Sequence, residues 1–305
     1  GDVILGGQRV NALPPAQRNI AMVFQFYALY PSLTVAENLA FPLYAQRLDA
    51  SAIAKQVERV AERLALGAVL HRLPSQLADG EKQRVAVGRA IVRDPACFLF
   101  DEPLSRLDVE LRQSMRTKIK EVLSDLSKAT VIVTHDQIEA LTMADRVAVM
   151  RDGRIEQVAT PHDIFTSPIN TFVAGFIGTP SMNLMEVVMQ RSSQNQASLR
   201  LGDTTLTVKD LPAAMQVVPG SRCTLGVRPR AFEFAPESAE DTFPVLLDLI
   251  EPMGAETLLH VLLGSQDLRV VVPRDTPARV GERLHIRCRP GQAHLFNDVG
   301  NLVVP

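Results

Sequence analysis

The chain lacks several features that would mark other classes of protein. Its three cysteines, Cys97, Cys223 and Cys288, lie far apart without paired spacing, which argues against a disulfide framework or a zinc site and favours a reducing compartment. The formal net charge is −2, so no basic excess points to nucleic acid as a partner. No run approaches about 18 consecutive apolar residues, so the sequence predicts no membrane-spanning helix.

The N-terminal part of the chain has the pattern of an α/β protein. Apolar residues at helical spacing predict helices over residues 49–66, 81–92 and 111–126. Unbroken apolar runs predict two buried strands at residues 97–100 and 130–134. Because strands and helices alternate, we expect a parallel sheet.

A change of pattern after about residue 178 predicts a second domain. Before it, Asp152-Gly153 between residues 146–150 and 155–158 indicates a hairpin that closes the far side of the sheet. After it, short alternating segments punctuated by Pro and Gly predict an all-β domain, a small barrel. We expect its strands at residues 197–201, 205–208, 224–227, 245–250, 257–263, 268–272 and 284–288. The predicted domains are therefore residues 1–178 and 179–305.

Two carboxylates end the first predicted strand, at the edge where open α/β sheets bind their ligands. Asp101 could hold Mg²⁺, an ion that keeps several of its waters and takes few protein ligands. Glu102 could polarise an attacking water. The alternative is a strand end that simply meets solvent.

Other polar motifs accompany this pair in a fixed order along the chain. They are Val23-Phe24-Gln25, Leu77-Ala78-Asp79-Gly80-Glu81-Lys82-Gln83-Arg84, Ser105-Arg106-Leu107-Asp108 and Thr134-His135-Asp136. In this order the motifs resemble those of the nucleotide-binding subunits of ABC transporters. The resemblance covers nearly all of residues 1–178 and implies ATP and Mg²⁺ as cofactors, in a P-loop NTPase-type α/β domain with a helical subdomain at about residues 26–92.

The resemblance assigns roles around the phosphates of ATP. Asp101 matches the Mg²⁺-binding carboxylate, and Glu102 matches the catalytic carboxylate that follows it. Gln25 matches the glutamine loop, which contacts Mg²⁺ and senses the transmembrane partner. His135 matches the switch histidine, which can hydrogen-bond the γ-phosphate and position a water.

Two further motifs are implied to face the nucleotide. The signature loop corresponds to Ala78, Asp79, Gly80 and Glu81, at the start of a helix whose free N–H groups favour an anion. The family usually has Ser-Gly-Gly-Gln at these four positions, so the charge of Asp79 is a departure. Opposite a phosphate it would cost about 4 kcal/mol at 4 Å and an effective dielectric of 20, and almost nothing if it points away. Asp108 matches the D-loop.

Further segments resemble the importer branch of the family, which takes up sugars and related solutes such as glycerol 3-phosphate. They are residues 26–31, 33–38, 173–178 and 182–183, with residues 225–229 and 294–296 matching an OB-type regulatory barrel. The implied partners are a second ATPase subunit, in a homodimer or a heterodimer, and permease subunits, with a solute-binding protein acting indirectly. The implied location is the cytoplasmic face of the bacterial plasma membrane.

One motif of the family is missing from the sequence. No lysine follows a Gly-x-x-x-x-Gly frame, so the loop that cradles the β- and γ-phosphates is absent. We expect the chain to be a fragment without its N-terminal segment, and to be inactive alone. The alternative is a non-hydrolytic regulator or scaffold with a degenerate nucleotide site. ABC-type ATPases of DNA repair or translation fit less well, because the chain has neither a coiled-coil insertion nor a tandem cassette.

Overall fold

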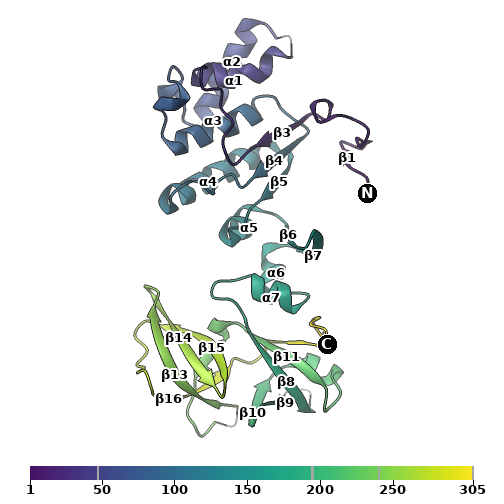
Figure 1. Ribbon diagram of the computed structural model, residues 1–305, viewed down its shortest axis with the longest axis vertical. Helices are drawn as coiled ribbons and strands as arrows, with labels where there is room; N and C mark the ends of the chain where they lie inside the picture. Colours follow the sequence, from purple (N-terminus) through teal and green to yellow (C-terminus); the bar gives the residue numbers. More distant parts are fainter. Residues whose placement is uncertain (47, 194–195, 240, 304–305) are drawn as a thin grey trace. The chain divides into compact units, whose positions relative to one another are not determined.

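The structure is a computed structural model that describes residues 1–46, 48–193, 196–239 and 241–303 (Figure 1). The chain divides into two compact units, Gly1–Ala144 and Asp145–Pro305. Among the described residues, no helix is both long enough and apolar enough to cross a membrane.

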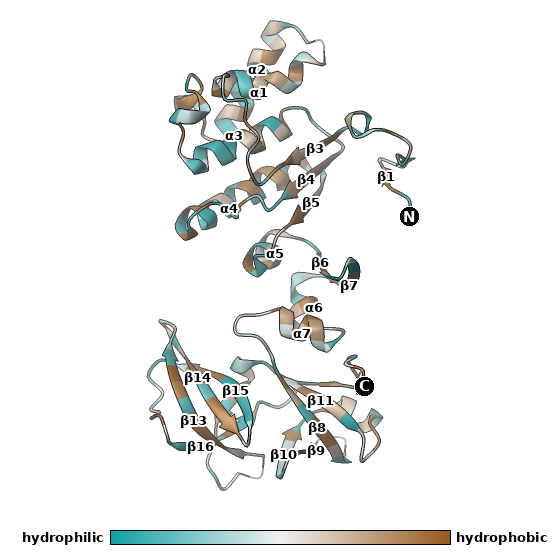
Figure 2. Ribbon diagram, in the orientation of Figure 1, coloured by the Kyte–Doolittle hydropathy of each residue, from teal (hydrophilic) through white to brown (hydrophobic). Residues whose placement is uncertain are grey.

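Three parallel strands form the central sheet of the first unit, in the order β3-β4-β5. They are β3 (Ile20–Val23), β4 (Cys97–Asp101) and β5 (Ala129–Val133). All three are hydrophobic along most of their length (Figure 2). The central strand β4 is buried up to Phe100, as its unbroken apolar run predicts. A two-stranded hairpin, β1 (Ile4–Leu5) with β2 (Gln8–Arg9), precedes them.

The expectation that residues 130–134 form a buried strand is only half right. The strand is present as β5, but Val131 and Val133 are 53% and 56% exposed. Both side chains lie on the face of the sheet that also carries Leu99 and Met22, and Met22 is 42% exposed, so among the described residues this face is largely uncovered. An apolar run predicts a strand but not whether both of its faces are covered.

The helices of the first unit begin at side chains that satisfy their free N–H groups. Thr34 and Glu37 form a reciprocal capping box, and Asp49 accepts a hydrogen bond from the backbone of Ala52. The helices are α1 (Val35–Tyr44), α2 (Ala50–Arg63), α3 (Asp79–Ile91), α4 (Val109–Leu126) and α5 (Gln137–Met143). The predicted helices correspond to α2, α3 and α4. Leu39, Leu64 and Val85 lie in the core that these helices share with the sheet.

The second unit begins with the hairpin predicted around Asp152-Gly153. Strands β6 (Val147–Arg151) and β7 (Arg154–Ala159) pair antiparallel, with Gly153 at a positive φ of 75° in the turn. Within the second unit β6 and β7 form a two-stranded sheet, and the expectation that this hairpin closes the α/β sheet of the first unit stays a prediction. An Asp-Gly turn specifies its own two strands and carries no information about further pairing. Two short helices follow, α6 (Pro161–Thr166) and α7 (Thr171–Phe176).

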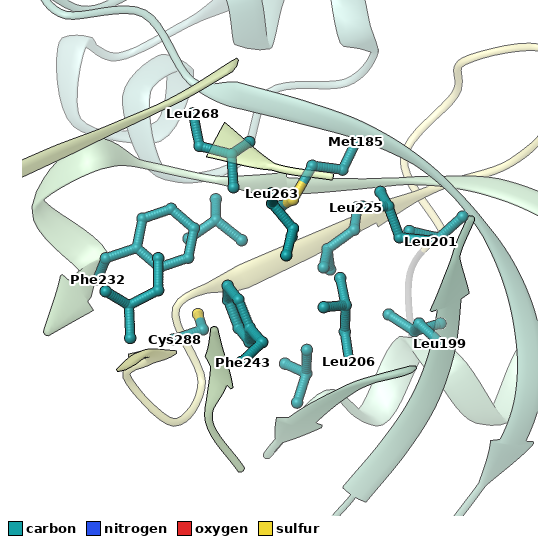
Figure 3. Close-up of a cluster of buried hydrophobic side chains, with 14 of the residues drawn as sticks. Met185, Leu199, Leu201, Leu206, Leu225, Phe232, Phe243, Leu263, Leu268 and Cys288 are labelled. Atoms are coloured by element: carbon teal, nitrogen blue, oxygen red, sulfur yellow. The ribbon is translucent and has the colours of Figure 1, made fainter. Parts of the chain in front are cut away.

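The rest of the second unit is an all-β domain of two five-stranded antiparallel sheets around one core. The orders are β10-β9-β8-β11-β17 and β12-β16-β13-β14-β15. The strands are β8 (Asn183–Ser192), β9 (Gln196–Leu201), β10 (Thr204–Lys209), β11 (Arg222–Val227), β12 (Phe232–Phe234), β13 (Phe243–Pro252), β14 (Glu256–Leu263), β15 (Gln266–Pro273), β16 (Arg283–Cys288) and β17 (Ala293–Phe296). Met185, Leu225, Phe232 and Phe243 meet between the two sheets (Figure 3). All seven strands expected in this region are present.

A buried arginine ties α6 and α7 to the β domain. Arg228 is 9% exposed, and its guanidinium donates hydrogen bonds to the carbonyls of Phe165 (2.7 Å) and Ile177. It also stacks on the Phe165 ring at 4.0 Å. Residues 145–178 therefore form one compact unit with the β strands, whereas the domain division predicted from sequence lies at residue 178.

Candidate functional site

The site lies at the carboxyl edge of the β3–β4–β5 sheet. Because the strands are parallel and in register, with Asp101 opposite Val133, their carboxyl ends share one edge. Gln25 follows β3 by two residues, Asp101 is the last residue of β4, and His135 follows β5 by two residues. The fold thus brings together three motifs that are far apart in sequence, at the edge where α/β sheets bind ligands.

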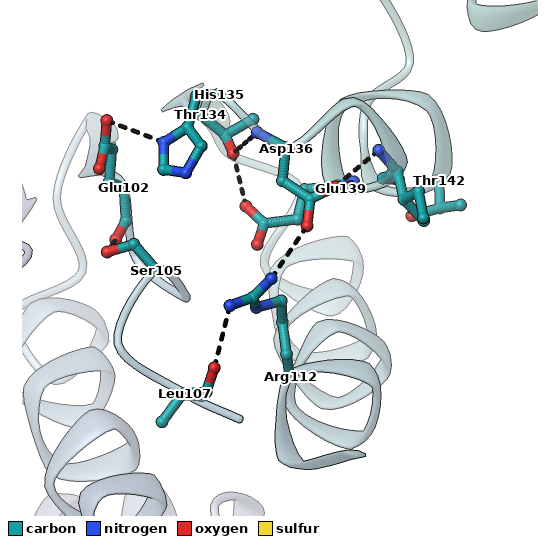
Figure 4. Close-up of polar contacts among 10 residues, drawn as sticks. Glu102, Ser105, Leu107, Arg112, Thr134, His135, Asp136, Glu139 and Thr142 are labelled. Atoms are coloured by element: carbon teal, nitrogen blue, oxygen red, sulfur yellow. Dashed lines mark hydrogen bonds and ion pairs between the residues drawn. The ribbon is translucent and has the colours of Figure 1, made fainter. Parts of the chain in front are cut away.

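Glu102 contacts both Gln25 and His135, and Figure 4 shows its contact with His135. Its Oε2 accepts a hydrogen bond from Gln25 Nε2 (3.2 Å), and its Oε1 lies 3.1 Å from His135 Nδ1. The backbone N–H of Glu102 donates to the carbonyl of Val133 (2.9 Å), which fixes it against β5. Its φ of 45° is in the left-handed region, a strained conformation for a residue with a side chain. The carboxylate is 30% exposed and the imidazole 71%, so both can reach a substrate.

Ser105 joins this group. Its hydroxyl accepts a hydrogen bond from Gln25 Nε2 (3.2 Å) and donates to the carbonyl of Glu102 (3.1 Å). Ser105 therefore closes the turn that follows β4 and helps to orient Gln25. The sequence indicates Ser105 only as part of a motif, because a lone serine in a loop carries no distinctive pattern.

The donor set suits Mg²⁺ better than a soft metal. Asp101 is exposed at the end of β4, and Gln25 uses Nε2 for its contacts with Glu102 and Ser105, which leaves its amide oxygen available as a ligand. Mg²⁺ prefers oxygen ligands and keeps most of its waters, so two protein ligands suffice. The residues that the structure describes contain no group of three or more His, Cys, Asp or Glu side chains able to hold a metal ion.

The signature segment starts helix α3, two residues earlier than predicted. Ala78 is the residue before the helix, and its N–H donates to the Glu81 carboxylate (2.8 Å). The Asp79 carboxylate is exposed and pairs with Lys82 Nζ at 3.0 Å. Gly80 is buried against Leu111 of α4, where an added Cβ would lie 2.8 Å from a side-chain carbon. Gly80 thus allows α3 and α4 to approach closely.

Asp108 has a visible structural role. Its Oδ1 accepts a hydrogen bond from the N–H of Leu111 (2.9 Å) and caps the first turn of α4. Within the described residues, the hydrogen bonds and ion pairs of Asp108 and of the segment Ala78 to Glu81 do not reach Gln25, Glu102 or His135. The structure therefore brings together only part of the predicted set of site residues.

Exposed aromatic side chains lie on the segment after β3 and on α1. Phe26 is 66% exposed and lies under the guanidinium of Arg106 at 4.2 Å. The ring of Tyr30 contacts Phe41 of α1 in a tilted arrangement at 4.4 Å, and the guanidinium of Arg89 lies over it at 4.5 Å. Tyr27 instead packs against the core, and burial raises the pKa of its hydroxyl, with a further increase from the charge of Asp79. We call Phe26, Tyr30, Phe41 and the 60% exposed Tyr44 the aromatic patch.

Comparison with known families explains these features together. Residues 1–105 match the ABC transporter family, and residues 225–296 match the TOBE domain. The chain belongs to the ABC transporter ATP-binding proteins that carry a TOBE domain. The first unit is thus part of an ABC ATPase domain of the P-loop NTPase fold, and the all-β domain is of the TOBE/OB type.

Several curated relatives match almost the whole chain. An uncharacterized ABC transporter ATP-binding protein, y4oS, of Sinorhizobium fredii is 42% identical over 97% of this chain and 78% of its own length. The sn-glycerol-3-phosphate import ATP-binding protein UgpC of Jannaschia sp. is 43% identical over 97% of this chain and 81% of its own length. The sulfoquinovosyl glycerol transport ATP-binding protein SmoE of Agrobacterium fabrum is 40% identical over 97% of this chain and 82% of its own length.

Proposed function

We propose that the chain belongs to the ATP-hydrolysing subunit of an importer for a carbohydrate or a related solute such as glycerol 3-phosphate. The observation that carries this proposal is the Glu102 carboxylate held between Gln25 and His135 at the carboxyl edge of the sheet. The names of the UgpC and SmoE relatives support the class of solute. ATPase subunits do not contact the solute, so the solute rests on these relatives alone.

In hydrolysis, Glu102 and His135 would have different roles. Glu102 accepts a proton from the attacking water, since its carboxylate is half-buried yet reachable and Gln25 fixes one of its oxygens. His135 donates a hydrogen bond toward the γ-phosphate and orients the same water. Bound Mg²⁺ would neutralise charge on the phosphates, with Asp101 and the amide oxygen of Gln25 as its protein ligands.

The proposal includes a phosphate-binding loop that residues 1–305 do not contain. The backbone N–H groups and the lysine of such a loop supply most contacts to the β- and γ-phosphates. We therefore expect residues 1–305 alone not to bind ATP appreciably. Activity requires a version that we call the loop-bearing fusion: residues 1–305 preceded by a segment from another ABC ATPase that carries the Gly-x-x-x-x-Gly-Lys-Ser/Thr loop.

The proposed partners are a second ATPase subunit and a permease at the cytoplasmic face of the plasma membrane. In the dimer, Asp79 and Gly80 of one subunit would face the ATP held by the other.

The aromatic patch is the proposed docking surface for the permease, because exposed aromatics backed by arginines anchor protein interfaces. Cysteine cross-linking from residues 25–33 should capture the permease; capture only from the β domain would contradict this.

The test of the proposed function is solute uptake. The loop-bearing fusion replaces the ATPase subunit in a bacterium whose glycerol-3-phosphate importer lacks its own, and uptake of labelled glycerol 3-phosphate is measured. We expect uptake with the wild-type fusion and none with the Glu102→Gln fusion. A fusion that binds ATP and assembles with the permease but hydrolyses nothing would instead favour the non-hydrolytic regulator.

A further inference from the structure

Two loops meet at the candidate site, one after β4 (residues 102–108) and one after β5 (residues 134–136). Glu102 belongs to the first and His135 to the second. The 3.1 Å contact between their side chains therefore depends on the relative position of the two loops. The hydrogen bond from the N–H of Glu102 to the carbonyl of Val133 holds the loops together at their start.

The loop that carries His135 is anchored on both sides of the histidine. Thr134 Oγ1 donates to Glu139 Oε2 (2.7 Å) and accepts from the N–H of Asp136 (2.9 Å). Asp136 Oδ1 accepts from the N–H groups of Ile138 (2.8 Å) and Glu139 (3.3 Å). His135 itself projects from this turn toward Glu102, so the turn sets the direction of the imidazole (Figure 4).

A single side chain links this turn to the far end of the other loop. Arg112 Nη2 donates to the carbonyl of Leu107 (3.0 Å), and Arg112 Nη1 lies 3.5 Å from Asp136 Oδ2. Figure 4 shows the guanidinium between the two loops, with one dashed contact to each. Asp136 thus binds α5 through one oxygen and Arg112 through the other. Arg112 and Asp136 are 28% and 19% exposed, so solvent weakens their interaction less than at an open surface.

We propose that Arg112 is a positioning residue that keeps His135 in register with residues 102–108, so that His135 and Glu102 act on the same water. The proposal rests on the proposed ATPase function. Its physical basis is the double contact, because Leu107 and Asp136 follow different strands and Arg112 binds both. Without the guanidinium each loop moves separately, and a misplacement of about 1 Å can lower a rate by about a hundredfold.

The rival explanation is that Arg112 merely attaches α4 to α5. The chain offers a matched control, since Lys120 also joins these helices, through its Nζ and the carbonyl of Thr142 at 2.5 Å. Within the part of the chain that the structure describes, the hydrogen bond of Lys120 involves neither loop. A purely structural role for Arg112 predicts that Arg112→Met and Lys120→Met behave alike.

The first arm of the test needs no ATPase activity. Hydrogen–deuterium exchange of residues 1–305 is compared for wild type, Arg112→Met and Lys120→Met. We expect Arg112→Met to speed exchange in both residues 105–108 and residues 134–139, and Lys120→Met to leave both segments unchanged. Equal effects of the two variants, or an effect confined to one segment, would overturn the proposal. If Arg112→Met does not fold, Asp136→Asn takes its place, because it retains an oxygen for the α5 cap and loses the charge facing Arg112.

The second arm uses the loop-bearing fusion. Arg112→Met should lower kcat for ATP by about tenfold to a hundredfold and leave KM unchanged, because the ground-state contacts to ATP do not involve Arg112. Arg112→Lys should recover part of the loss, since one ammonium reaches only one of the two acceptors. An active fusion in which Arg112→Met keeps the wild-type kcat would overturn the proposal. A wild-type fusion that hydrolyses no ATP would contradict the proposed function, and the exchange arm would still decide whether the loops are linked.

Discussion

The two units of the chain differ in where their most notable polar side chains lie. In residues 145–305 buried polar groups hold the unit together: Arg228 binds helix carbonyls, and Lys209 pairs with Asp241, whose side chain is 4% exposed. Residues 1–144 also contain a buried polar group that bonds within the unit, Asn38, but the polar groups at the sheet edge remain reachable, and the imidazole of His135 is 71% exposed. The comparison teaches that these polar groups of the β unit stabilise its own fold, whereas the sheet edge of the α/β unit presents carboxylates and an imidazole to solvent.

The largest effect is expected at the sheet edge of the α/β unit. In the loop-bearing fusion, Glu102→Gln should preserve ATP binding and slow hydrolysis by about 10²–10⁴-fold, the usual contribution of a positioned general base. His135→Ala should slow hydrolysis by a similar factor. Phosphate release and nucleotide binding are measured on the same samples, with the exposed Glu110→Gln as a control that should turn over normally. Wild-type turnover by Glu102→Gln would mean that another carboxylate is catalytic.

The next largest effect is expected in the β unit, residues 145–305. Arg228→Met removes hydrogen bonds from a charged donor to buried carbonyls and should lower the free energy of unfolding of residues 145–305 by about 3 kcal/mol. That corresponds to a fall of roughly 6–12 °C in the calorimetric midpoint of this unit. Arg230→Met is the matched control. It breaks the exposed pair with Glu256 and a long exposed contact to the carbonyl of Thr179 (3.5 Å), and should cost less than about 1 kcal/mol. Equal shifts for both variants would refute the special role of Arg228.

A smaller effect is expected at Asp79, the charge that departs from the family. Its carboxylate is exposed and partly neutralised by Lys82, so its repulsion of a phosphate from the other subunit should be near the solvent limit of about 1 kcal/mol. Asp79→Gly and Asp79→Asn should each increase the ATP-bound dimer about fivefold in a Glu102→Gln fusion, measured by sedimentation with Mg-ATP. Lys82→Met should decrease it. A dimer fraction that does not respond to Asp79 would show that the carboxylate points away from the phosphate.

The smallest effects are opposite responses of the two units to pH. Burial, and next the charge of Asp136, raise the pKa of Glu139 above its ordinary value of 4.5, although the Thr134 hydrogen bond opposes this. Its contribution to stability is present below pH 4.5 and is lost as pH rises through the folded pKa. Burial and the charge of Arg228 lower the pKa of His294 below its ordinary 6.5. Its contribution is present above pH 6.5 and is lost as pH falls through the folded pKa.

Hydrogen exchange separates these two responses because it reports on each unit by itself. Glu139→Gln should make the stability of residues 1–144 less sensitive to rising pH, and His294→Gln should make residues 145–305 less sensitive to falling pH. Variants whose pH dependence matches the wild type would show that neither group is coupled to folding.

Local patterns in the sequence predict much of the fold. The apolar stripes of α2 and α4 and the strands of the β domain all depend on neighbouring residues. The order of the motifs also predicts that Gln25, Glu102 and His135 reach one sheet edge. Their roles in catalysis remain predictions.

What the sequence does not predict depends on contacts between distant residues. The exposure of Val131 on β5 follows from the uncovered sheet face that it shares with Met22, and the grouping of residues 145–178 with the β domain follows from Arg228, which lies 51 residues beyond Ile177. The link from Arg112 to Leu107 and Asp136 has no sequence pattern, since an arginine on a helix most often faces solvent. The left-handed backbone of Glu102 depends on the same kind of long-range support.

The central claim is that the sheet edge around Glu102 hydrolyses ATP only when a phosphate-binding loop completes it. The direct test is calorimetric titration with millimolar Mg-ATP, followed by phosphate release, for residues 1–305 and for the loop-bearing fusion side by side. We predict no measurable binding or release by residues 1–305, and both by the fusion. Micromolar ATP binding by residues 1–305 alone, or a fusion that binds ATP without releasing phosphate, would contradict the claim.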